Sequence, residues 1–114
     1  MAITIEQREH RDAVVLVVTG RLTLTECHGN LKNVVRDLIE RGRKRIVLDL
    51  EAVPFIDSAG LGELVSSYAS VTQLGGSLRL ASVNHRVRAA LDAARLTPIL
   101  QLTGLPDTQH ATSR

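Results

Sequence analysis

The feature of this sequence that most restricts its fold is the apolar run Ile46-Val47-Leu48, which continues through Asp49 to Leu50. A strand with one face in water alternates apolar and polar residues, whereas a consecutive apolar run is typical of a strand covered on both faces. We therefore expect a central strand at 45–50, in a parallel sheet with crossover helices. Asp49 is either a buried, hydrogen-bonded acid or a residue at the edge of the strand.

The rest of the chain alternates between strand patterns and amphipathic helix patterns. Period-two or continuous apolar patterns predict further strands at 3–8, 13–19 and 77–81. Apolar residues at helical spacing predict helices at 25–41, 59–74 and 85–94. Residues 97–102 fit either a short strand or a helical turn. The predicted fold class is α/β, a single domain whose mixed sheet has an N-terminal hairpin, then parallel strands, with amphipathic helices packed on it.

Polar residues and glycines mark the ends of the predicted helices. Thr23 and Glu26 fit a capping box, in which a threonine oxygen and a carboxylate three positions later bind free N–H groups of the first turn. Gly42 lies where a left-handed C-cap is needed, and Asn84 is a good N-cap. The first helix is expected to bury an apolar face made of Leu24, Cys27, Leu31, Val34, Val35 and Leu38.

Length and composition indicate a small globular protein. With 114 residues the chain has the size of one domain, which we expect at 1–103, followed by a flexible tail at 104–114 that has little to bury. A net charge of +2 and only two aromatic residues argue against a nucleic-acid partner. No apolar run is long enough to span a membrane, so no membrane partner is expected.

Cysteine and histidine usage gives no sign of a metal or cofactor. Cys27 is the single cysteine and cannot form an internal disulfide, and no Cys/His cluster has metal-ligand spacing. The N-terminus does not resemble a signal peptide. We expect a cytoplasmic protein without a cofactor.

The segment Val53-Pro54-Phe55-Ile56-Asp57-Ser58-Ala59-Gly60-Leu61-Gly62 leads into the second predicted helix and allows four interpretations of its serine. A hydrolase nucleophile would require G-x-S-x-G and a suitably placed histidine, which are absent, so we expect no hydrolase activity. A phosphate-binding loop is weakly supported, because Gly60-Leu61-Gly62 matches no complete motif. Asp57 or Ser58 could cap the helix, and Ser58 could be phosphorylated.

Five segments together closely resemble the STAS-domain anti-sigma factor antagonists of bacteria. They are Val18–Leu22, Ile46–Leu50, Val53–Gly62, Leu74–Leu78 and Val87–Leu91, and the D-S-x-G-L-G motif at 57–62 is the most specific of them. The resemblance covers about residues 3 to 102. It implies a mixed sheet with helices packed on one side.

In function, the resemblance implies a switch. Ser58 would be phosphorylated by a partner that is both an anti-sigma factor and a serine kinase. The unphosphorylated protein would bind this partner and free a sigma factor, and a phosphatase would reset the switch. The implied contact residues are Gly20, Arg21, Leu22, Thr23, Asp57, Ser58, Ala59, Gly60 and Leu61.

Three details of this resemblance affect which residue roles of the family can be assigned to this chain. Thr23 stands where switched members often have an acid, so an acidic contact there is not carried over. Ala59 replaces a more usual second serine and leaves the acceptor intact, while Gly60 and Gly62 are expected to let a partner backbone approach closely. The alternative function is a non-switching STAS scaffold that serves only for docking in a stress-sensing or lipid-trafficking complex.

The one basic cluster, Arg41-Gly42-Arg43-Lys44-Arg45, also has more than one interpretation. Cations in the last turn of a helix stabilise it through the helix dipole and keep the surface soluble. Docking of an acidic partner is the alternative, and DNA binding is a more distant one.

Overall fold

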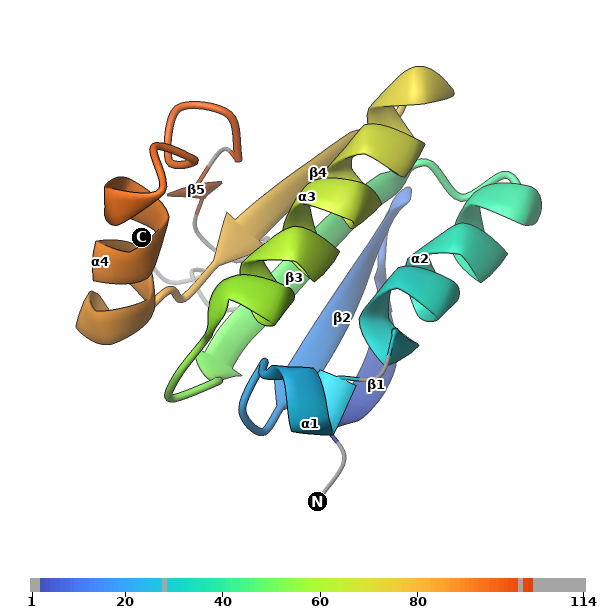
Figure 1. Ribbon diagram of the computed structural model, residues 1–114. Coiled ribbons are helices and arrows are strands. Elements are labelled where there is room, and N and C mark those ends of the chain that lie inside the picture. The colour runs from blue at the N-terminus through green and yellow to red at the C-terminus, as the bar shows by residue number, and fades with distance from the viewer. Residues whose placement is uncertain (1–2, 28, 101, 104–114) are drawn as a thin grey trace, which may run out of the picture.

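Five strands form one sheet in the order β1-β2-β3-β4-β5 in the computed structural model, which describes residues 3–27, 29–100 and 102–103 (Figure 1). β1 is antiparallel to β2, and the other neighbouring strands are parallel. The mixed sheet and its central third strand are confirmed. The strands are β1 (Thr4–His10), β2 (Ala13–Thr19), β3 (Arg45–Ala52), β4 (Ser77–Ala81) and β5 (Leu102–Thr103).

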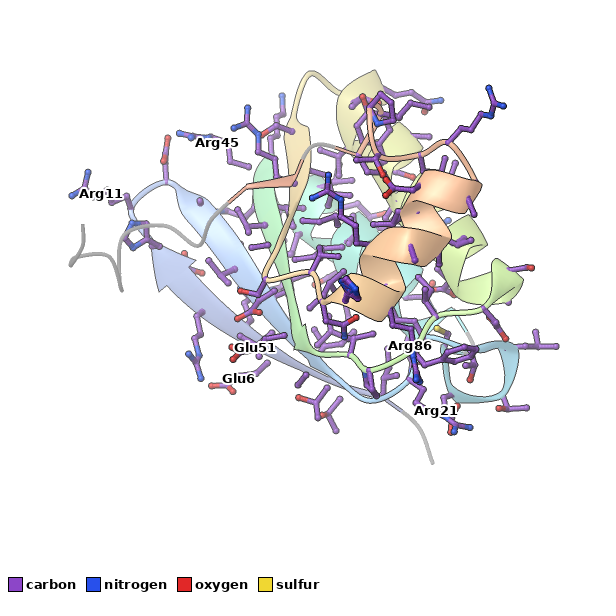
Figure 2. The ribbon with its side chains drawn as sticks, turned by 90° about the vertical axis from the view of Figure 1, so that its left-hand side faces the viewer. Glu6, Arg11, Arg21, Arg45, Glu51 and Arg86 are labelled. Atoms are coloured by element: carbon purple, nitrogen blue, oxygen red, sulfur yellow. The ribbon has the colours of Figure 1, made fainter. Side chains whose placement is uncertain are left out.

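The helices lie on one face of the sheet (Figure 2). This follows from the strand order, because each right-handed crossover in β2 to β5 steps to the next strand in the same direction. The helices on one side that the resemblance implies are confirmed, whereas the covering of both faces of β3 by crossover helices, which its apolar run suggested, is wrong. The helices are α1 (Leu24–Cys27), α2 (Asn30–Glu40), α3 (Ser58–Gln73) and α4 (His85–Ala93).

The first predicted helix, at 25–41, is in fact two helices. The chain adopts a left-handed conformation at Gly29, with φ of 76°, which ends the regular turns between α1 and α2. The capping box does not form, because the Thr23 hydroxyl donates to the Glu26 carboxylate instead of capping the backbone. Leu24 is 69% exposed, so its expected place in the core is also wrong.

The core lies between the sheet and the helices and is almost entirely aliphatic. Cys27 belongs to it, as predicted, and Asp49 is buried with Oδ1 accepting the Glu51 N–H at 3.0 Å. The helix ends at Gly42 and Asn84 are also as expected: Gly42 has φ of 82°, and Asn84 Oδ1 accepts the Val87 N–H at 2.8 Å. The central strands contribute the fully buried residues Val14, Leu16, Val18, Leu48, Leu50 and Leu80.

The C-terminal part of the described chain contains a turn and a very short strand. Leu100 N–H donates to the Leu96 carbonyl at 2.7 Å, and the two-residue β5 follows. The predicted tail at 104–114 lies outside the described residues. Within the described chain, no helix is both long enough and apolar enough to cross a membrane.

The basic cluster after α2 is largely neutralised by acids of the β1–β2 hairpin and of α2. Figure 2 shows Arg45 near Arg11, at the opposite end of the molecule from Arg21 and Arg86. Arg43 pairs with Glu9 at 2.6 Å and Arg45 with Asp12 at 2.6 Å, and these two ion pairs connect the segment after α2 with the hairpin. Arg41 pairs with Asp37 of α2 at 3.1 Å, within the last turn of its own helix.

Candidate functional site

Two loops that are distant in the sequence join at the carboxyl ends of β2 and β3. The Leu22 N–H donates to the Phe55 carbonyl at 3.0 Å, and the Leu22 carbonyl accepts the Asp57 N–H at 3.0 Å. These bonds form an isolated parallel bridge between Leu22 and Ile56. The loop after β2 and the loop after β3 therefore form one continuous surface, which includes both segments of the expected partner contact.

Ser58 is the first residue of α3, and its side chain is exposed. The sequence left open whether Asp57 or Ser58 caps the helix, and the structure shows that Asp57 does: its Oδ1 accepts the Gly60 N–H at 3.0 Å. The Ser58 hydroxyl makes no hydrogen bond to any residue that the structure describes. A hydroxyl that is exposed and not used for capping is accessible to a modifying enzyme.

The Asp57 carboxylate binds two helix starts at once. Its second oxygen, Oδ2, accepts the N–H of Leu24, the first residue of α1, at 3.1 Å. Hydrogen bonds from the backbone N–H groups of Gly60, then of Leu24 and Ala59, lower the pKa of Asp57. Asp57 is therefore ionised at neutral pH, and it places a fixed negative charge beside the Ser58 hydroxyl.

Gly60 allows the start of α3 to pack directly on the loop after β2. A Cβ at this position would lie 2.1 Å from the Leu22 carbonyl oxygen and 2.8 Å from Ile56 Cγ1. Gly60 is buried, so it serves packing within the chain and not the close approach of a partner, which corrects the expectation for this residue. Gly62 is exposed, and a Cβ there would meet nothing within 4 Å.

The expected contact residues differ in exposure. Arg21 and Ser58 are exposed, whereas Gly20, Asp57, Ala59 and Leu61 are half-buried. The buried residues of this set are Leu22, Thr23 and Gly60.

Thr23 has an internal role at the position where the resembling family often has an acid. Its hydroxyl donates to the Glu26 carboxylate, and this bond is the main cause of a lowered Glu26 pKa. Arg21 Nε lies 3.7 Å from the same carboxylate. An acid thus lies beside this loop, but it comes from α1.

Sequence reasoning missed two exposed apolar side chains at this site, Leu24 and Phe55. Leu24 was assigned to the core because its spacing fitted a long helix, and Phe55 was treated only as part of a motif. Gly29 was the available signal for Leu24, because glycine inside a helix is unfavourable and commonly marks an end. Phe55 was detectable as one of two aromatic residues in the chain, within a loop that precedes a helix.

The family of the chain is decided by a match to the family model described as STAS domain, over residues 4–110. This chain belongs to the STAS domain family. Its curated relatives include the anti-sigma F factor antagonist of Paenibacillus polymyxa, with 29% identity over 90% of this chain and 87% of the relative. A Thermotoga neapolitana protein, named as an anti-sigma factor antagonist homologue, is 33% identical over 80% of each chain.

Solved structures give the same result for the STAS fold. A crystal structure from Thermotoga maritima, described as that of an anti-sigma factor antagonist, has a TM-score of 0.82 and 26% identity to this chain. The match covers 96% of this chain and 95% of that one.

Proposed function

We propose that this STAS domain is an anti-sigma factor antagonist controlled by phosphorylation of Ser58. In its unphosphorylated form it binds an anti-sigma factor that is also a serine kinase, and a sigma factor is freed in the cytoplasm. Phosphorylation ends the binding, and a phosphatase restores it. The names of its curated relatives support the antagonist function, and the geometry of Ser58 supports the switch.

The observation that carries the proposal is the division of roles between Asp57 and Ser58. Asp57 caps α3, so the neighbouring hydroxyl is exposed and available at the start of the helix. If Ser58 were the cap, its phosphorylation would remove a bond that the fold needs. With Asp57 in that role, Ser58 can be modified while the fold is retained.

A phosphate at Ser58 would change the surface more than the fold. It adds roughly −1.5 to −2 charges, and the helix dipole of α3 compensates part of this charge. Asp57 is already ionised beside it, so the modified loop presents clustered negative charge. A partner that fits a neutral hydroxyl would lose affinity through charge and bulk.

The direct test is to incubate the protein with serine kinase anti-sigma factors of its own organism and to locate the phosphate by mass spectrometry. We expect phosphate on Ser58 in the wild type and none in Ser58→Ala. Phosphate on another residue would contradict the proposal.

Binding to the same anti-sigma factor is then measured by calorimetry, with circular dichroism as the control for folding. Ser58→Asp should bind more weakly than the wild type, and Ser58→Ala should bind but not be released by the kinase. Gln73→Glu is the matched control, because it adds one negative charge at the exposed far end of the same helix. Equal affinity of wild type and Ser58→Asp would favour the non-switching docking scaffold.

A further inference from the structure

Two of the exposed large apolar side chains belong to the segments whose backbones join next to Ser58. Leu24 is 69% exposed and Phe55 is 39% exposed, although both belong to backbone that is firmly bonded. The Leu24 N–H is held by Asp57, and the Phe55 carbonyl is held by the Leu22 N–H. We call these two side chains the Leu24–Phe55 patch.

The backbone bonds determine where this patch lies. Asp57 precedes Ser58 directly, and the residues that bond to Leu24 and Phe55 are Asp57 and Leu22 of the joined loops. The backbones of Leu24 and Phe55 therefore lie at the same joined edge as the proposed switch serine. Because the backbone of the patch is held before binding, a partner would order few additional groups by covering it.

The charges at this edge indicate the chemistry of the partner. Figure 1 shows the loop after β3 between the start of α4 and α1, and Figure 2 shows Arg21 and Arg86 at this end of the molecule. Arg86 is exposed and has no ion pair with a described residue, and Arg21 is exposed with its Nε 3.7 Å from the Glu26 carboxylate. Both oxygens of Asp57 are used by backbone N–H groups.

We infer that the Leu24–Phe55 patch is the apolar anchor of the partner surface, with Arg21 and Arg86 binding carboxylates at its rim. This inference rests on the proposed function, because its occupant is the anti-sigma partner. The contact surface of that partner should combine an apolar pocket with acidic residues around it. Apolar anchors near the centre of an interface carry much of the affinity, whereas rim charges mainly guide association.

The anchor is tested with Leu24→Ser and Phe55→Ser in calorimetry against the cognate anti-sigma factor. Each should raise Kd at least tenfold, which corresponds to about 1.4 kcal/mol. The matched controls are Leu74→Ser and Ile99→Ser, because these side chains are 53% and 46% exposed at the far end of α3 and after α4. Both controls should bind like the wild type, and Leu24→Met should restore most of the affinity lost in Leu24→Ser.

The rim is tested by the salt dependence of the association rate. Arg21→Gln and Arg86→Gln should slow association at low salt and reduce its salt dependence, because they remove steering charges. Arg36→Gln, which removes an exposed charge from α2, is the control and should have little effect.

The outcomes separate this inference from the proposed function. If Ser58→Asp weakens binding while Leu24→Ser and Phe55→Ser bind like Leu74→Ser, the patch is not the anchor and the switch stands. If no anti-sigma factor of the organism binds the wild type, both ideas are overturned. A wild-type dimer in light scattering that Leu24→Ser dissociates would mean that a second copy covers the patch, which also overturns the inference.

Discussion

The Asp57 carboxylate accepts the backbone N–H of Leu24 at 3.1 Å, across 33 positions of sequence. With its other oxygen it caps α3 through the Gly60 N–H at 3.0 Å. One acid therefore fixes the start of the helix that carries Ser58 and the start of the short helix that carries Leu24. Together with the backbone bonds between Leu22 and the loop after β3, this side chain determines the loop geometry of the proposed partner surface.

Replacing Asp57 should show how much its two hydrogen bonds contribute to the free energy of unfolding. Asp57→Ala loses both and should lower the free energy of unfolding by about 1–2 kcal/mol, as loss of a helix cap does. Asp57→Asn keeps one side-chain oxygen in place of two equivalent ones, so it should lower the free energy of unfolding by less than Asp57→Ala does. Urea denaturation measures both, and equal stability of wild type and Asp57→Ala would contradict this role.

Stability should also depend on pH through Asp57. The pKa of Asp57 is lowered in the folded protein, so the unfolded chain binds the proton more tightly than the folded protein does. Ionised Asp57 therefore stabilises the folded state. The contribution is complete above the ordinary aspartate pKa of ~3.9 and is lost as pH falls through the lower folded value.

The comparison that isolates this effect is wild type against Asp57→Asn, measured by urea denaturation at pH values from about 6 to 3. The wild type should lose more stability than the variant over this range. Other acids with lowered pKa, such as Glu9 and Asp12, are present in both proteins and cancel in the difference. Parallel losses in the two proteins would show that Asp57 does not contribute.

The two glycines of the motif should respond in opposite ways to alanine. Gly60→Ala places a Cβ against the Leu22 carbonyl and should destabilise the protein by about 1–3 kcal/mol through overpacking. Gly62→Ala has open space and should stabilise α3 by about 0.5–1 kcal/mol through helix propensity. Thermal denaturation of both variants checks this, and a stable Gly60→Ala would show that α3 does not pack as described.

The Cys27 thiol should be unreactive in the folded protein. Burial, followed by the charges of Glu63, Asp57 and Glu26, raises the pKa of Cys27 to about 11. The thiolate reacts with iodoacetamide, so labelling at pH 8 should be at least about 100-fold slower than in the urea-unfolded chain. Similar rates in both states would contradict the buried position of this residue.

The sequence predicted the larger part of the fold and the centre of the candidate site. The apolar run at 46–50 identified the middle strand, and the helical spacing after Gly60 identified α3 to within one residue at each end. These features are encoded locally, because side-chain periodicity reflects which face of an element is buried. The D-S-x-G-L-G segment likewise identifies Ser58 as the candidate residue from the sequence alone.

Only the tertiary structure decided how the site is built. Asp57 and Ser58 are both good caps, and the structure shows Asp57 in this role, with its second oxygen on the Leu24 N–H of a distant segment. The break at Gly29 turns Leu24 outward, and Gly60 is required by the Leu22 carbonyl and not by a partner. Local periodicity carries no information on such contacts, because they arise only when packing of the sheet and helices brings distant backbone groups within hydrogen-bond distance.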